Sequence, residues 1–131
     1  MTPQDPPKDV PSELIREGAR RIDPKDLEKV VDRAEEIKKK FALPGPLNRF
    51  VEDGRLLIEL VRDYLSGKYR QLPYWTIAAS AFTLIYVFNP LDIVPDVLPV
   101  VGVLDDATIV GACLMMIEQD LLHYRKWKLG R

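Results

Sequence analysis

The sequence predicts an all-α fold in which amphipathic helices pack on a short apolar helical hairpin with an acidic, Pro/Asp-rich bend. Three observations lead to this prediction. Apolar residues recur at helical spacing in residues 12–42 and 47–65. Residues 72–122 are strongly apolar apart from the bend at residues 89–106, which gathers acids and prolines. Prolines and glycines separate these segments at points where helices must end. A chain of 131 residues is long enough for one folding unit with a real core.

Charged residues are distributed unevenly along the chain. Residues 1–70 carry 15 basic and 14 acidic side chains, whereas residues 71–117 carry four acidic and no basic ones. A protein that binds nucleic acid needs Lys and Arg concentrated on one face. The basic clusters here are Lys38–Lys40 and Arg125–Arg131. We therefore expect no nucleic-acid partner.

The single cysteine, Cys113, excludes an intramolecular disulfide and a cysteine zinc site. Its neighbours are small or apolar, which indicates a buried thiol in a cytoplasmic or membrane setting. The N-terminal residues show no basic segment followed by an apolar one, so we expect no cleavable signal peptide. Any membrane contact is then expected from the C-terminal half.

Residues 1–11 hold four prolines and almost no apolar side chains, which predicts a disordered tail. An amphipathic helical region follows at residues 12–42. Its clearest start signal is Asp23 as N-cap with Pro24 in the first helical position. The opposite, charged face is interpreted as a solvated surface, with contact to an anionic membrane as the alternative. The apolar face consists of Leu27, Val30, Val31, Ala34, Ile37 and Phe41.

Residues 43–46, Leu-Pro-Gly-Pro, cannot continue a helix and are interpreted as a hinge. A second amphipathic helix follows, with Ser66 and Gly67 as its C-terminal stop. Gly54 lies on its apolar face, where the missing side chain would permit a close helix crossing. That face consists of Leu47, Phe50, Val51, Gly54, Leu57, Ile58, Val61 and Leu65.

The first arm of the hairpin holds the strongest membrane signal. Residues 72–91 form a run of 20 uncharged residues, near the ~20 that a helix spanning a bilayer requires. Tyr74 and Trp75 stand where interfacial anchors are expected. One side of this arm carries small hydroxyl residues that would let another helix approach closely. These are Thr76, Ser80 and Thr83.

The second arm is shorter, because only the 11 residues Ala107 to Ile117 lie between charged residues. Such a helix rises about 16 Å, roughly half of a hydrocarbon core of ~30 Å. A simple two-pass hairpin is therefore strained, and a re-entrant hairpin or an apolar pair packed on the amphipathic helices fits the same pattern. We favour membrane association, with a soluble cytoplasmic protein as the alternative. Basic residues flank the hairpin and are missing from its bend, which predicts cytoplasmic N- and C-termini.

The bend is the feature that we expect to carry function. Asn89 is placed to cap a short turn, and Asp105 or Asp106 to cap the helix that begins near Ala107. Structural capping is therefore the first interpretation of this motif. The motif consists of Asn89, Pro90, Asp92, Pro95, Asp96, Gly102, Asp105 and Asp106.

The carboxylates of the bend also admit a chemical interpretation. Carboxylates among apolar side chains are costly unless they are paired, protonated or bound to a cation, and no Lys or Arg is near in sequence. Their spacing matches neither a calcium loop nor a di-metal Glu-x-x-His motif. A cation or proton site and a partner-binding bend are the alternatives to capping, and apart from a divalent cation no cofactor is expected. The candidate metal ligands are Asp92, Asp96, Asp105 and Asp106.

Other residues with functional chemistry stand alone. His123 has no second histidine for a metal site or a proton relay, so we interpret it as an interfacial structural residue. Trp127, among aromatic and basic neighbours, is typical of a membrane-surface anchor or of an ordinary helix end. No serine lies in a nucleophile motif and no glycine in a phosphate-binding loop. The sequence favours a protein that is not an enzyme.

Residues 86–106, YVFNPLDIVPDVLPVVGVLDD, resemble the signature of the YkvA-like family of small helical proteins. A Pro-x-Asp-x-x-Pro-Asp element is followed about six residues later by a Gly-x-x-Asp-Asp element, and all seven defining residues are present. The resemblance covers roughly the last 80 residues, which delimits a YkvA-like helical domain at residues 47–128. It implies a membrane-associated protein of unknown function and names no activity.

These observations predict a membrane-associated helical protein that acts as a non-enzymatic scaffold or interaction module. The expected partners are membrane lipid and, beyond it, a protein partner or a second copy of the chain. One alternative is a cation-binding, transport-related or enzymatic protein that uses the four aspartates. The other is a soluble helical bundle that binds a protein partner through its apolar surface.

Overall fold

The computed structural model describes residues 10–93 and 105–130, and all regular structure within these ranges is helical. The predicted all-α fold is confirmed. The elements in chain order are α1 (Val10–Ala19), α2 (Pro24–Asp32), α3 (Ala34–Ala42), the 3₁₀ helix η1 (Pro46–Phe50), α4 (Val51–Leu65), α5 (Tyr74–Phe88), the 3₁₀ helix η2 (Pro90–Asp92), α7 (Asp106–Met116) and α8 (Glu118–Leu129).

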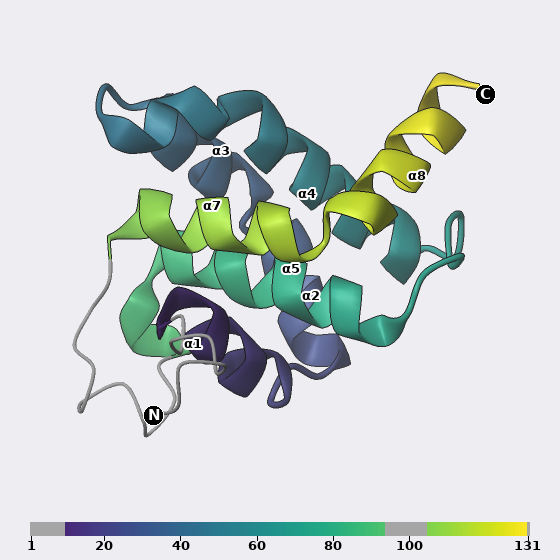
Figure 1. Cartoon of the computed structure of the whole chain (residues 1–131), viewed down its shortest axis with the longest axis horizontal. Helices are drawn as coiled ribbons and strands as arrows, with labels where there is room; N and C mark the ends of the chain where they lie inside the picture. Colours follow the sequence, from purple (N-terminus) through teal and green to yellow (C-terminus); the bar gives the residue numbers. More distant parts are fainter. Residues whose placement is uncertain (1–9, 94–104, 131) are drawn as a thin grey trace, which may run out of the picture.

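Helix α5 is the centre of the molecule. It contacts α1, α2, α3, α4 and α7, and Figure 1 shows it running through the middle of the bundle, antiparallel to α7. Every residue from Thr76 to Val87 is buried. The amphipathic helices and the apolar hairpin thus pack together as predicted, with the apolar faces of the N-terminal helices covering α5.

The predicted transmembrane helix is wrong. Helix α5 has 15 residues, because Pro73 precedes its start and Asn89 and Pro90 follow its end. Such a helix rises about 22 Å, which is short of a hydrocarbon core of ~30 Å. No helix in the described ranges is long and apolar enough to cross a bilayer. Residues 76–87 of the uncharged run build the core of the protein instead.

The second arm of the hairpin is α7, which has the 11 residues expected from the apolar run. The chain leaves the helical conformation at Ile117, and α8 then continues in a new direction that projects from the bundle (Figure 1). Ile117 is 2% exposed, so its side chain fixes the break against the core. Residues 118–122, predicted to end the hairpin, therefore belong to α8.

The N-terminal boundary differs from the predicted one. Residues 1–9 lie outside the described residues, but Val10 and Pro11, assigned to the disordered tail from the sequence, form the start of α1. Proline is tolerated in the first turn of a helix, because the N–H that it lacks would have no helical acceptor there. Leu14 and Ile15 are buried, so α1 packs on the core from its second turn.

The amphipathic region after residue 23 is two helices rather than one. The backbone of Arg33, at φ −101° and ψ 16°, separates α2 from α3. Asp23 caps α2 with Pro24 in the first turn, which confirms the predicted start, and Asp26 completes a capping box. The predicted apolar face is buried at Leu27, Val30, Ala34, Ile37 and Phe41.

The chain bends at the predicted hinge, residues 43–46, where Gly45 has a φ of 140° that favours glycine. Helix η1 begins within this segment and leads into α4, which ends at the predicted stop with Ser66 as C-cap. Gly54 of α4 lies against the ring of Phe41, so close that a Cβ at this glycine would come within 2.7 Å of the ring. The predicted close crossing is confirmed, and it joins α4 to α3.

Candidate functional site

The bend connects the end of α5 to the start of α7, and both lie at the same end of the bundle (Figure 1). The described motif residues are Asn89, Pro90, Asp92, Asp105 and Asp106. The predictions for Pro95, Asp96 and Gly102 fall outside the described residues and stay predictions.

Two side chains of the bend cap helices. Asn89 Oδ1 accepts a hydrogen bond of 3.1 Å from the backbone N–H of Leu91 and is the N-cap of η2. Asp105 is the N-cap of α7, and its carboxylate accepts from the backbone N–H of Ala107 at 2.9 Å and from Thr108 Oγ1 at 2.8 Å. The cap of α7 is therefore Asp105, the first of the two predicted alternatives.

These hydrogen bonds stabilise the ionised form of the Asp105 carboxyl. The Thr108 hydroxyl and the Ala107 N–H hold the pKa of the Asp105 carboxyl below its ordinary value, and the guanidinium of Arg49 contributes in the same direction. Because the donors prefer the ionised form, Asp105 carries a full negative charge at neutral pH.

Asp106 follows at once and has a different environment. Its half-buried position raises the pKa of its carboxyl above the ordinary value, Lys40 opposes that rise, and the charge of Asp105 adds to it. Two adjacent carboxyls are thus shifted in opposite directions, because one is hydrogen-bonded and the other is desolvated.

Lysines from the N-terminal helices reach the bend. Lys29 Nζ of α2 lies 2.9 Å from Asp92 Oδ2, and Lys40 Nζ of α3 donates to the backbone oxygen of Phe88 at 2.9 Å. Lys40 therefore satisfies a carbonyl at the negative C-terminal end of α5. The sequence offered no basic residue near the bend, and these partners are 63 and 48 residues away along the chain.

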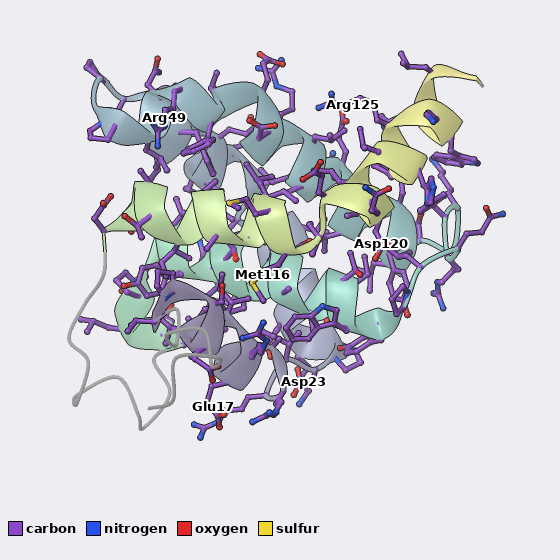
Figure 2. The ribbon with its side chains drawn as sticks, in the orientation of Figure 1. Glu17, Asp23, Arg49, Met116, Asp120 and Arg125 are labelled. Carbon is purple, nitrogen blue, oxygen red and sulfur yellow. The ribbon has the colours of Figure 1, made fainter. Side chains whose placement is uncertain are left out.

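Two arginines complete the basic surroundings. The guanidinium of Arg33 lies 5.7 Å from the centroid of the Phe88 ring. Arg49, on η1, contributes to the lowered pKa of Asp105. Figure 2 shows Arg49 on the side of the bundle where α7 begins. Four cations, Lys29, Arg33, Lys40 and Arg49, therefore stand around the acidic bend, and we call them the basic ring.

A buried polar cluster that the sequence did not indicate joins α4 to α8. Tyr124 donates a hydrogen bond of 2.6 Å to Asp63 Oδ2, and Asp63 is 6% exposed. Lys128 Nζ lies 3.5 Å from the same oxygen and 3.4 Å from Glu59 Oε2.

The predicted hydroxyl stripe lies inside the bundle. Thr76, Ser80 and Thr83 are fully buried. Thr76 Oγ1 donates to Asp120 Oδ2 at 2.5 Å, which links α5 to α8. Cys113 Sγ of α7 lies 3.7 Å from the backbone oxygen of Ala79 on α5, so α7 is the helix that approaches the small residues of α5. The predicted buried thiol is confirmed.

The predicted anchor residues have separate environments. Tyr74 is 40% exposed and donates to the backbone oxygen of Ile22, and Trp75 is 36% exposed. Trp127 is half-buried and stacks on Tyr124, with the centroids 5.8 Å apart. His123 is exposed.

Comparison with known proteins places this arrangement in a family. Residues 76–112 match the model of a family described as "Protein of unknown function (DUF1232)". The chain is 34% identical to the "Uncharacterized membrane protein YkvA" of Bacillus subtilis (strain 168) over 71 residues, which are 54% of this chain and 67% of the relative. The chain belongs to the YkvA-like family. No solved structure matches it.

In this YkvA-like chain the family match includes α5, the bend and most of α7. The basic ring lies outside the matched segment, because its members come from α2, the α2–α3 break, α3 and η1. Within the described ranges no three His, Cys, Asp or Glu side chains come together to hold a metal ion. Asp96 is outside these ranges, so the cation hypothesis stays a prediction.

Proposed function

We propose that this chain is a non-enzymatic, membrane-associated interaction module that touches lipid with the bend end of its bundle rather than with a spanning helix. The observation that carries the proposal is Leu91. This residue of η2 is 83% exposed, and it opens a stretch rich in Ile, Val and Leu that continues to Leu104. An exposed large apolar side chain at the start of an apolar stretch fits insertion into a lipid interface.

The basic ring supports the same end of the molecule as the contact surface. The bend has four acids, and an uncompensated charge of that sign would be repelled by an anionic leaflet. Lys29 of the basic ring pairs with Asp92, and Lys40 and Arg49 oppose the charges of Asp106 and Asp105. We therefore expect apolar insertion, rather than net positive charge, to supply most of the affinity for membranes.

The relative's name gives independent support, because YkvA of Bacillus subtilis is named a membrane protein. A contact through one end of the bundle requires no helix to cross the bilayer. It also leaves both chain ends on the same side of the membrane, which we propose is the cytoplasmic side.

Vesicle flotation of the purified chain tests this proposal. Wild type should float with vesicles of phosphatidylcholine, and with vesicles that also contain phosphatidylglycerol, to a similar extent. Leu91→Asp should lower the partition coefficient for the vesicles by about tenfold, because the transfer of one leucine to an apolar phase is lost. Trp75→Asp is the matched control, since Trp75 is 36% exposed but lies in the first turn of α5, at the opposite end of that helix from the bend.

Comparison of the two variants separates a loss of membrane contact from a loss of stability. Both substitutions are at exposed positions, so both proteins should unfold at nearly the wild-type urea concentration. Equal flotation of Leu91→Asp and wild type would contradict a contact at the bend. A wild-type chain that stays at the bottom of the gradient with both kinds of vesicle would overturn membrane association and leave the soluble bundle.

A further inference from the structure

A groove of about 250 Å³ lies on the opposite part of the molecule, between α7, α8 and the start of α4. Its floor includes Leu114, Met115 and Leu122, and its edges carry Asp53, Glu118 and Arg125. Figure 2 shows Arg125 extending from α8 into the angle between α8 and α4. The groove thus has an apolar floor with charges of both signs around it.

Three large apolar side chains of this region are exposed. Met115 is 78% exposed, Leu122 is 40% exposed and Leu129 is 81% exposed. Leu122 and Leu129 stand seven residues apart on α8, a spacing that returns to the same helix face after two turns. Met115 lies on α7, before the break at Ile117, and lines the groove together with Leu122.

The charges at the groove have no partner of opposite sign within the described residues. Asp53, Glu118 and Arg125 take part in none of the ion pairs or side-chain hydrogen bonds there. By contrast, Lys128 on the other side of α8 is paired with Glu59 and Asp63. The lysine on the inward side of α8 is therefore paired with acids, whereas the charged side chains at the groove form no ion pair among the described residues.

We infer that this groove binds a second copy of the same chain, with the two α8 helices antiparallel about a two-fold axis near Leu122. Glu118 lies four residues before Leu122 and Arg125 lies three residues after it. Antiparallel pairing therefore brings Arg125 opposite the partner's Glu118, and Glu118 opposite the partner's Arg125. Leu122 then meets its own copy.

The same register places the partner's Leu129 toward the groove. Leu129 lies seven residues after Leu122 on the same face of α8. In the antiparallel pair the partner's Leu129 therefore lies beyond the first residue of α8, toward the groove that Leu114 and Met115 line. A two-fold interface must be self-complementary, and a surface with an apolar centre and one cation beside acids meets this condition. A lipid tail would leave Glu118 and Arg125 without partners.

Charge exchange tests the pairing directly. Wild type should dimerise in sedimentation equilibrium, whereas Arg125→Glu and Glu118→Arg should each raise the dimer dissociation constant by about tenfold or more, because each places two pairs of like charges at the interface. When the two variants are mixed in equal amounts, both pairs become attractive, and association should return to near the wild-type level. Lys25→Glu is the matched control, because it makes the same change of charge at an exposed position on α2, outside the groove.

Association of the two mixed charge variants tests the inferred pairing. Variants that stay monomeric after mixing would overturn the antiparallel register, and a monomeric wild type would overturn the second copy as the occupant. Leu122→Cys provides a second measurement, because an antiparallel pair centred on this residue should form an intermolecular disulfide on mild oxidation. Lys126→Cys should form none. The buried thiol of Cys113 does not interfere. Leu91→Asp should dimerise like wild type, which separates this surface from the lipid-contacting end.

Discussion

At the residue scale, the acids of the bend have individual roles. Asp92 is paired with Lys29, Asp105 caps α7, and Asp106 is half-buried beside Lys40. The sequence predicted capping because Asn and Asp before a helix carry a local signal. It could not predict the lysine partners, because a contact across 63 residues leaves no local trace.

The cap at Asp105 gives a pH-dependent prediction. Asp105→Ala should lower the free energy of unfolding by about 0.5–2 kcal/mol at neutral pH, because two hydrogen bonds to the start of α7 are lost. The folded state holds the pKa of Asp105 below its ordinary value. The stabilisation is therefore fully present above that value and is lost as the pH falls through the lower folded pKa.

Urea unfolding over a range of pH checks this prediction. The deficit of Asp105→Ala should shrink in strongly acidic solution, and Asp105→Asn should lose less at neutral pH because its amide oxygen can still accept from Ala107. A deficit that is the same at every pH would show that the carboxylate charge has no part in the cap.

The buried cluster gives a second prediction at this scale. Tyr124→Phe should lower the free energy of unfolding by about 1–3 kcal/mol, because the buried carboxylate of Asp63 loses a hydrogen-bond donor. Tyr64→Phe is the control, since Tyr64 is half-buried and contacts Tyr74 and Arg70 through its ring. Urea denaturation measures both, and equal effects would argue against a special contribution from the Asp63 hydrogen bond.

At the element scale, helix starts and stops were predictable where a residue type enforces them. Asp23 with Pro24 and the stop at Ser66 are such cases. The breaks at Arg33 and Ile117 contain neither proline nor glycine and were missed. They let neighbouring helices pack in different directions, a requirement of the tertiary structure that no local pattern records.

Close helix crossings give a prediction at this scale. A Cβ at Gly18 of α1 would overlap the ring of Phe82 on α5. Gly18→Ala should therefore cost about 1–3 kcal/mol through overpacking, more than the ~1 kcal/mol that alanine gains in helix propensity. At Gly111 the nearest atom is Phe50 Cζ at 3.6 Å, an ordinary contact.

Gly111→Ala is accordingly the matched control and should leave stability unchanged or raise it by up to ~1 kcal/mol. Thermal unfolding followed by circular dichroism compares the two variants. If Gly18→Ala were as stable as Gly111→Ala, α1 would have to lie farther from α5 than the structure places it.

At the scale of the whole molecule, the apolar residues 76–87 form part of the protein core. Hydropathy and length describe which residues avoid water, but not what surrounds them. The short second arm was the one sequence feature that argued against a plain two-pass span. The five helices that contact α5 place it in the core, and their contacts with α5 are long-range.

The thiol of Cys113 reports on this core. Burial raises its pKa to about 11, and thiol reagents attack the thiolate. Folded protein at neutral pH should therefore resist labelling, and the labelling rate in urea should follow the global unfolding of the bundle. Leu43→Cys, at a position 60% exposed, is the control that should label at once. Fast labelling of Cys113 without urea would mean that α5 and α7 separate easily.

We propose that α5 is protein core and that only the bend end meets lipid. Photolabelling of vesicle-bound protein with a carbene probe on the lipid acyl chain, followed by peptide mapping, distinguishes core from lipid-facing residues. Label should appear in the peptide that begins near Leu91, and residues 76–87 should show background levels. Label distributed along residues 76–87 would contradict this proposal, because those side chains would then face lipid rather than the surrounding helices.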